Sequence, residues 1–493
     1  MSQAPTPIDR NVLSESVRLA DVMERLNTGV QGMVLLVNEA GALTGVMTDG
    51  DVRRALLAHG TTDLPAASCM NRKFTSGRAS DSHETNVALL SERCRQVPVL
   101  DEAGRPVELL SWAGLWKMAL VNPSLSGNEA KYVLDCMTSG WISSAGAYVG
   151  RFESALAEQQ GSTGAIACSS GTAALHLALL AARIGPGDEV VVPSFTFGAT
   201  ANAVVNVGAR PVFIDVDPET WTMTAEGLEA ACSPRTKAVI PVHIYGHPCN
   251  MTPIMEVARA RGLIVIEDCA EAMTALCDGK LAGSFGDIGC HSFFSNKIMT
   301  TGEGGALVSS NPELLDRIGL YRDHGMRKTR RYWHEVSGLN YRMTNLQAAI
   351  GLAQIERLAN FRRHRDALRS AYDDGLGNLP GVTLMPKAAW ADPVNWLYTI
   401  MLPDEATLLT VRERLDASGI ETRRVFDPLH DQPAFNNARI VGKMAVSRDL
   451  YARGISLPTG NTTTFEEVAR VTEHVAAALA AASRMKRTSA GAG

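Results

Sequence analysis

The chain has 493 residues, of which 45% are hydrophobic, and its formal net charge at pH 7 is −5. This length predicts about two or three domains with a large core, and the mild acidity argues against nucleic acid or an acidic membrane surface as the main partner. The nine cysteines include no CxxC pair, which is typical of reduced thiols rather than of a disulfide framework or a zinc site. Because no apolar run is long enough to span a bilayer, we expect a cytoplasmic protein without a membrane partner.

Roughly the first 120 residues contain an internal repeat, a feature that identifies duplicated units. Asn38–Asp51 aligns without a gap on Asp101–Gly114. Each copy has an apolar strand (Met33–Val37 or Val97–Leu100), a turn that carries Glu-Ala-Gly, and a second strand followed by a helical segment. Two strands joined by such a turn predict a β-hairpin in each copy.

This repeat resembles a pair of CBS motifs over about residues 9–60 and 65–120. The resemblance implies a module that binds an adenine nucleotide such as AMP or ATP between its two halves. Thr48 matches the position of the family's phosphate-binding hydroxyl, and Asp51 the position of its ribose-binding carboxylate. The second copy has Gly114 in place of the acid. Nucleotide binding and a purely structural role therefore both remain open for this module.

After residue 187, short apolar segments alternate with helical segments up to about residue 310. Strands separated by helices are joined by right-handed crossovers and form a mostly parallel sheet, so we expect an α/β fold. Such a sheet binds its ligands at the carboxyl ends of its strands. The candidate strands are Glu189–Pro193, Pro211–Asp215, Ala238–Val242, Leu263–Glu267 and Ala306–Ser309.

Three stretches between residues 170 and 297 carry chemistry that fits one cofactor. Ser170, Gly171 and Thr172 open a helix, where free amides bind a phosphate. Asp268 ends a buried strand, and its carboxylate could keep a pyridine nitrogen protonated. Lys297 follows a strand-like run in a loop of small residues, where an amine forms a Schiff base with an aldehyde cofactor. With the hydroxyl of Ser292 nearby in sequence, these groups predict pyridoxal 5′-phosphate (PLP).

The region from about residue 122 to 485 resembles the DegT/StrS-type nucleotide-sugar aminotransferases, which have the fold-type-I architecture and use PLP. This resemblance implies a large PLP-binding domain over residues 122–380 and a small α/β domain over residues 381–485. Residues 1–121 precede them as the CBS-like domain, and residues 486–493 are predicted to be a disordered tail. The motifs that carry the resemblance are Ser170–Thr172, Pro193–Phe197, Glu267–Glu271, Ser292–Lys297 and Asn340–Asn345.

Further residue roles follow from the resemblance alone. Phe197 matches an aromatic residue that stacks on the cofactor ring, and Glu271 matches a residue near the phenolic oxygen of the cofactor. Asn340 matches a residue that reaches the phosphate of the neighbouring subunit, which implies a homodimer. His243 and His247 flank a short loop and have no third ligand close in sequence, so we expect structural histidines and no metal site.

The implied reaction moves an amino group from L-glutamate to a nucleotide-linked keto sugar, with Lys297 as the acid and base. Two segments, Val242–Pro248 and Asn296–Gly305, look most like those of GDP-perosamine synthases, which implies a GDP-linked 4-keto-6-deoxy sugar. A UDP- or dTDP-linked keto sugar is the alternative. A PLP-dependent sugar dehydratase is a weaker one, because relatives of that kind have histidine in place of this lysine. A nucleotide sensor built on the CBS-like pair is the candidate from another class.

Overall fold

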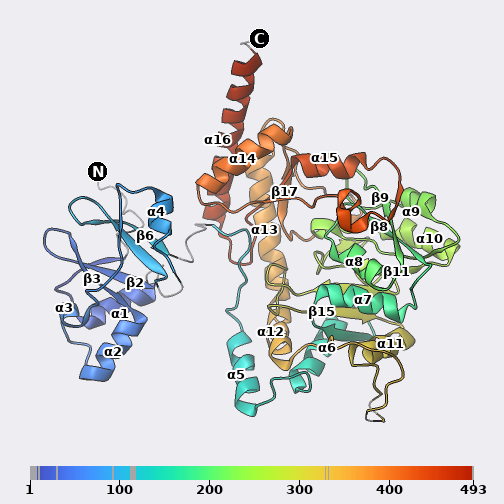
Figure 1. Cartoon of the computed structure of the whole chain (residues 1–493), viewed down its shortest axis with the longest axis horizontal. Helices are drawn as coiled ribbons and strands as arrows, with labels where there is room; N and C mark the ends of the chain where they lie inside the picture. The colour runs from blue at the N-terminus through green and yellow to red at the C-terminus, as the bar shows by residue number, and fades with distance from the viewer. Residues whose placement is uncertain are drawn as a thin grey trace. The chain divides into compact units, whose positions relative to one another are not determined.

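The computed structural model describes residue 8 and residues 11–28, 32–91, 94–111, 118–327, 329–330 and 332–490. The chain divides into two compact units, Met1–Met118 and Ala119–Gly493, shown in Figure 1 and described here one at a time. Gly114, the position where the second repeat lacks an acid, lies outside the described residues. Within the described ranges, no helix combines the length and the apolar character that a membrane crossing requires.

The N-terminal unit is built from two three-stranded sheets of the same design. In each sheet the first strand pairs parallel with the second, the second pairs antiparallel with the third, and the register shifts near the end of the hairpin. The predicted repeat and its two hairpins are therefore confirmed. The strands are β1 (Val12–Ser14), β2 (Met33–Val37), β3 (Leu43–Thr48), β4 (Gly77–Arg78), β5 (Gln96–Leu100) and β6 (Pro106–Ser111).

The two hairpin turns are also equivalent in their hydrogen bonds. Asn38 Oδ1 accepts from the amides two and four residues later, and Asp101 Oδ1 does the same in the second copy. An Asx turn of this kind fixes a tight reversal between two strands. Among its described residues, the unit has the helices α1 (Leu19–Thr28), α2 (Asp49–His59), α3 (Ala66–Cys69) and α4 (His83–Val87).

The second unit is organised around an eight-stranded sheet with the order β19-β9-β8-β10-β11-β14-β15-β7. Each neighbouring pair is parallel except the two pairs that involve β15. The predicted α/β fold with a mostly parallel sheet is confirmed. The strands are β7 (Gly164–Cys168), β8 (Glu189–Pro193), β9 (Arg210–Ile214), β10 (Thr236–Val239), β11 (Ile264–Asp268), β14 (Ile288–Ser292), β15 (Gly305–Ser309) and β19 (Arg439–Val441).

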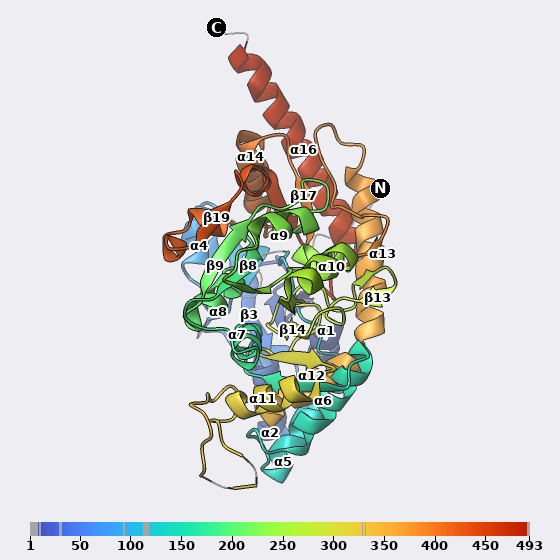
Figure 2. The same ribbon diagram turned by 90° about the vertical axis from the view of Figure 1, so that its right-hand side faces the viewer.

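Helices cover both faces of this sheet, as Figure 2 shows. Side chains alternate along a strand, so Val190 and Val192 of β8 face one core and Val191 faces the other. The first core contains α7 (Gly171–Ala181), α8 (Ala199–Asn206) and α11 (Pro312–Arg322), and the second contains α9 (Ala225–Ala231) and α10 (Met251–Arg261). The continuous apolar strands follow from burial on both faces.

Three further helices form a support beside the sheet: α5 (Glu129–Ser139), α6 (Ala147–Gln160) and α12 (Asn345–Ile355). The long helix α13 (Leu358–Leu376) then leads to a second, three-stranded sheet. That sheet has the order β17-β20-β18, and α14 and α16 pack against each other. The strands of this sheet are β17 (Tyr398–Met401), β18 (Arg423–Arg424) and β20 (Gly454–Leu457), and the helices of this region are α14 (Glu405–Ala417), α15 (Ala445–Arg453) and α16 (Phe465–Ala490). Three short strands form a separate sheet: β12 (Leu276–Cys277), β13 (Lys280–Leu281) and β16 (Ala391–Asp392).

Two features of the C-terminal region differ from the sequence-based expectations. First, β19 lies in the stretch assigned to the small domain, yet it pairs with β9 of the large sheet. Second, the predicted disorder of residues 486–493 is wrong for residues 486–490, which continue α16, while residues 491–493 lie outside the described part. Alanine, arginine, lysine and methionine are strong helix formers, so a helix that packs through its first turns continues past its last buried contact.

Candidate active site

The site residues predicted from the sequence come from one edge of the large sheet. Ser170 follows β7, Asp268 is the last residue of β11, and Ser292 is the last residue of β14. Because these strands run in the same direction, their carboxyl ends meet at a single edge. Lys297 comes from the loop between β14 and β15, and Phe197 from the loop after β8, so both also lie at this edge.

The start of α7 forms a cradle for an anion. Ser170 caps the helix, with its Oγ accepting from the amide of Ala173 at 3.1 Å. The amides of Gly171 and Thr172 precede the first bond of the helix and point to its open end. A Cβ on Gly171 would lie only 2.7 Å from the Cβ of Ser292, so glycine is needed for the two segments to meet. The open amides and the Ser292 hydroxyl fit the phosphate of PLP.

Lys297 lies in a tight turn after β14. Its amide donates to the carbonyl of Phe294 at 2.9 Å, and Gly302 continues the loop with a φ of +84°, which favours glycine. The lysine side chain is 14% exposed, and its Nζ lies 3.7 Å from Oε1 of Glu271. The same Nζ lies 3.8 Å from the ring centre of Trp396. The amine therefore has an acid and an aromatic face as its immediate neighbours.

Burial shifts the acid–base chemistry of this pair. It lowers the pKa of the Lys297 amine, although the charges of Glu271 and Asp268 favour the ammonium form. It raises the pKa of Glu271 to about 7, although the charge of Lys297 and the amide of Tyr245 favour the carboxylate. That amide donates to Glu271 Oε2 at 2.7 Å. An amine and an acid that titrate closer to neutrality than usual are suited to proton transfer at Nζ.

Asp268 is held by two donors at the end of β11. The hydroxyl of Thr200 donates to Oδ2 at 2.8 Å, and the amide of Ala270 donates to Oδ1 at 3.1 Å. Burial raises the pKa of Asp268, while the Thr200 hydrogen bond and the charge of Lys297 oppose that rise. A positively charged ring nitrogen would supply the buried carboxylate with an ionic partner, so the residue fits the pyridine of PLP. Thr200 lies in α8, 68 residues away, and no sequence signal identified it.

A stack of aromatic rings borders the lysine. Tyr245 stacks on Trp396 with ring centres 5.8 Å apart and on Phe426 with ring centres 5.3 Å apart. Phe197, predicted to stack on the cofactor, is 60% exposed, and its ring centre lies 5.9 Å from that of Phe426. Sequence analysis missed Tyr245, Trp396 and Phe426 as site residues, because their proximity depends on contacts between distant segments.

The backbone at Tyr245 is strained. Tyr245 has a φ of +51°, a left-handed conformation that is uncommon for a residue with a side chain. A Cβ on the next residue, Gly246, would overlap the carbonyl oxygen of Val394, so glycine is required there. This conformation directs the Tyr245 amide to Glu271 while its ring joins the aromatic stack. Strain of this kind concentrates at functional sites.

Asn340 lies beside the end of β7 in its own chain. The next residue, Tyr341, accepts from the amide of Ser169 through its carbonyl at 2.8 Å. The Asn340 side chain is exposed, and its Oδ1 accepts from Nε of Arg342 at 3.2 Å. Its position therefore leaves the amide NH₂ group accessible from outside the chain.

His243 belongs to a buried hydrogen-bond cluster. Its Nε2 lies 3.0 Å from Oε2 of Glu267, and the Cys269 sulfur lies close to both, although the sequence suggested no third group near this histidine. Glu267 also accepts from three backbone amides of residues 283, 285 and 286. The carboxylate oxygens of Glu267 are therefore already used as hydrogen-bond acceptors. We interpret the cluster as a structural one that holds the loop of residues 283–286. His247 lies apart and receives the amide of Ala388 at its Nε2.

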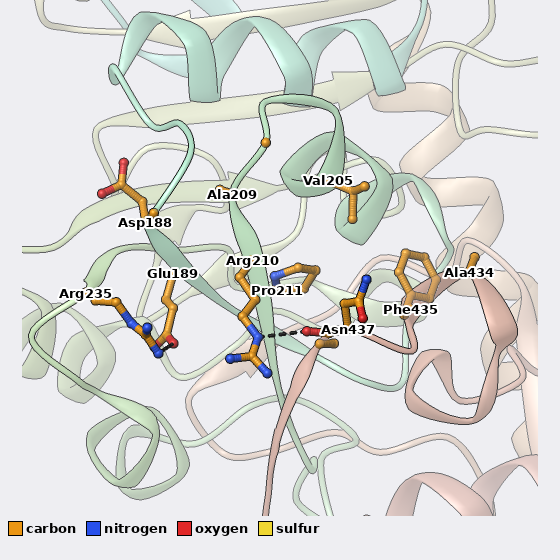
Figure 3. Close-up of a pocket in the computed structure, with 13 residues that line it drawn as sticks. Asp188, Glu189, Val205, Ala209, Arg210, Pro211, Arg235, Ala434, Phe435 and Asn437 are labelled. Atoms are coloured by element: carbon orange, nitrogen blue, oxygen red, sulfur yellow. Dashed lines mark hydrogen bonds and ion pairs between the residues drawn. The ribbon is translucent and has the colours of Figure 1, made fainter.

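A hollow of about 620 Å³ lies at the opposite edge of the sheet (Figure 3). It is lined by Glu189 and Arg210, the first residues of β8 and β9, and by Phe435. Glu189 pairs there with Arg235 at 2.7 Å, and Arg210 Nε donates to the carbonyl of Asn437. Because the lysine lies at the carboxyl edge, this hollow is separate from the candidate active site.

Comparisons with known proteins agree with this geometry. Residues 123–476 match the model of the DegT/DnrJ/EryC1/StrS aminotransferase family. The GDP-perosamine synthase of Caulobacter vibrioides is 46% identical over 72% of this chain and 96% of its own length, and that of Escherichia coli O157:H7 is 42% identical over 72% and 96%. The crystal structure of an aminotransferase from Streptoalloteichus hindustanus superposes with a TM-score of 0.70 and 32% identity, covering 74% of this chain and 99% of that one.

The fold and the lysine site thus define a PLP-dependent aminotransferase of fold type I. The chain belongs to the DegT/DnrJ/EryC1/StrS aminotransferase family. The family match begins at residue 123 and so leaves the N-terminal unit outside it.

Proposed function

We propose that the protein transfers the amino group of L-glutamate to a nucleotide-linked 4-keto-6-deoxy sugar, with a GDP-linked sugar as the first candidate. The observation that supports this most is the similarity to enzymes named GDP-perosamine synthase, which extends over nearly their whole length. The PLP that the family uses supplies an electron sink for charge that develops at the carbon bearing the amine.

The residues of this chain have separate tasks in that reaction. With PLP bound, the α7 cradle and Ser292 would hold its phosphate, and Asp268 would keep its ring nitrogen protonated. The free amine of Lys297 would act as the acid and base, with its Nζ taking and returning the proton that moves during amine transfer. Glu271, 3.7 Å from Nζ, sets how readily the lysine gives up and takes that proton.

The substrate is tested by comparing three nucleotides. The purified protein is supplied with PLP, L-glutamate and a GDP-, UDP- or dTDP-linked 4-keto-6-deoxy sugar, and the amino-sugar product is measured by mass spectrometry. The proposal predicts the highest kcat/KM for the GDP-linked sugar. A higher value for either of the other nucleotides would move the assignment to that alternative, and dehydration without amine transfer would favour the dehydratase.

We also propose that the active enzyme is a homodimer in which Asn340 completes the partner's phosphate site. The exposed Asn340 side chain supports this, as do apolar side chains exposed on and after α5, including Leu134, Met137 and Trp141. The test mixes Lys297→Ala and Asn340→Ala subunits, each of low activity alone. Random exchange of dimers should restore about a quarter of the parent activity, because half of the dimers then hold one intact site. A monomeric protein, or no recovery after proven subunit exchange, would contradict the proposal.

For the N-terminal unit we propose an adenine nucleotide as regulatory ligand, bound near Thr48 and Asp51. The repeated sheet design supports a paired module of this kind. Calorimetric titration of the full chain with AMP and ATP tests it, with Asp51→Ala as the binding-defective variant. If neither nucleotide binds the parent protein, the unit has a structural role instead.

A further inference from the structure

A buried arginine lies behind the segment that carries the catalytic lysine. Arg365 on α13 is 0% exposed. Within the part of the chain that the structure describes, no carboxylate lies within 4.0 Å of its nitrogens. Burying a guanidinium without an acid is costly, so the groups that bind it need an explanation.

The hydrogen bonds of Arg365 go to neutral oxygens. Its Nη1 donates to the carbonyls of Asn395 at 2.9 Å and Trp396 at 2.7 Å, and its Nε donates to Oδ1 of Asn461 at 2.7 Å. Its Nη2 is buried and has no hydrogen-bond partner in the part of the chain that the structure describes. Burial lowers the pKa of Arg365 to about 9, so the group keeps its charge at neutral pH. A charged donor makes stronger hydrogen bonds than a neutral one, so both of these segments are firmly held.

The two residues that Arg365 holds bind the backbone on either side of Lys297. The indole Nε1 of Trp396 donates to the carbonyl of Asn296 at 2.9 Å, and Nδ2 of Asn461 donates to the carbonyl of Ile298 at 2.8 Å. The Trp396 ring also lies under the lysine amine, with Nζ 3.8 Å from its centre. One guanidinium is thus connected, through these two residues, to the carbonyl groups of the residues just before and just after the catalytic lysine.

We propose that Arg365 is a positioning residue for the transamination site. It holds Trp396 and Asn461 so that these two residues fix the backbone around Lys297 and the aromatic face beside its amine. Arg365 itself does not touch the amine and acts through its two partners. This inference rests on the proposed transamination at Lys297 and adds a connection from α13 to that residue.

The same helix offers a matched control. Arg369, one turn further along α13, is 9% exposed and pairs with Asp373 at 3.6 Å. Its Nη2 donates to the carbonyls of Met385 and Pro386. Arg369 therefore also links α13 to the C-terminal region, but its bonds do not involve the lysine loop. Replacing either arginine with methionine removes a buried charge. Of the two replacements, Arg365→Met is the one that removes the hydrogen bonds leading to the backbone around Lys297.

The experiment compares Arg365→Met with Arg369→Met by three measurements. Hydrogen exchange reports the amides of the lysine loop, and trace labelling with acetic anhydride over pH reports the pKa of the Lys297 amine without cofactor. Steady-state kinetics separate kcat from KM for L-glutamate. We expect Arg365→Met to speed exchange in residues 294–301 at least about tenfold, to shift the labelling profile and to lower kcat by about 10²-fold with a smaller change in KM. Arg369→Met should lower thermal stability without these changes.

Two further variants serve if Arg365→Met does not fold. Trp396→Phe and Asn461→Ala each remove one of the two bonds to the lysine loop, and each should produce part of the same exchange and labelling change. The proposal is overturned if Arg365→Met, or both single-bond variants, keep the parent exchange rates and labelling profile. A parent protein that never transaminates would contradict the proposed function, whereas the exchange and labelling data would still decide the role of Arg365.

Discussion

The two units of the molecule use acidic residues in contrasting ways. In the N-terminal unit, Thr48 and Asp51 are three residues apart and are joined by hydrogen bonds. Asp51 Oδ2 accepts from the Thr48 amide at 2.8 Å and from the Thr48 hydroxyl at 2.7 Å. The other oxygen of Asp51 pairs with Arg54 at 2.6 Å. This capping box begins α2 and is local in sequence.

At the lysine site, by contrast, the neighbours come from distant segments. The Lys297 amine lies 3.7 Å from a carboxylate oxygen of Glu271 and 3.8 Å from the ring centre of Trp396, and Asp268 at the end of β11 is held by Thr200 of α8. Local structure explains the acid of the N-terminal unit, but it does not explain why an amine and two acids are buried together in the second unit. Buried ionisable groups are costly, so their retention indicates function.

The first prediction concerns Lys297, the proposed acid and base of the second unit. Lys297→Ala should slow formation of 2-oxoglutarate from L-glutamate by at least about 10³-fold, because the proton carrier is lost. Single-turnover kinetics with PLP measure the effect. Lys280→Ala is the control, because that exposed lysine lies over the ring of Phe285 and away from the site. Equal rates for the two variants would remove the distinction between the two units.

The second prediction concerns a buried histidine near the site. Burial lowers the pKa of His291 from 6.5 to about 4, and neither of its ring nitrogens has a hydrogen-bond partner among the described residues. Between about pH 6.5 and pH 4, His291 therefore binds a proton in the unfolded chain but not in the folded chain. The free energy of unfolding falls as the pH drops through this range. His291→Phe should remove up to roughly 3 kcal/mol of that acid-induced loss.

Denaturant titrations at pH 7 and pH 4.5 measure this difference. His59→Gln, at an exposed histidine at the end of α2, is the control for replacing a histidine at the surface. If His291→Phe loses as much stability as the parent protein between the two pH values, the burial of this histidine is not a source of acid sensitivity.

The smallest predicted effect is in the N-terminal unit. Asp51→Ala removes the capping box and should destabilise α2 by about 1 kcal/mol. Hydrogen exchange of the first-turn amides of α2 measures it. Asp49→Ala is the matched control, because Asp49 lies in the same turn and its side chain pairs with Arg53 at the surface. An unchanged exchange rate in Asp51→Ala would show that this acid is not needed for the helix and would strengthen a role in ligand binding.

Sequence patterns were sufficient to place the candidate site residues that lie at or just after the end of a strand. Ser170, Asp268, Ser292 and Lys297 each follow an apolar run, and parallel strands bring such positions to one edge. The same logic found the two hairpins of the N-terminal repeat, because each turn is encoded by its own few residues.

The missed features depend on contacts between distant residues. Trp396 binds a carbonyl 100 positions earlier, and Arg365 binds Asn461 96 positions later. Neither separation leaves a periodic signal in the chain. Similarly, β19 is too short to stand out by composition, and its place beside β9 is set by packing of the core. Such contacts form only when the whole unit folds.

The central claim is that Lys297 is the residue that binds the cofactor. It is tested most directly by reducing the PLP-loaded protein with borohydride, which fixes the cofactor to the amine that holds it, and by mapping the modified peptide by mass spectrometry. We expect one modified site per chain, at Lys297. Modification at another lysine, or none after incubation with PLP, would contradict it.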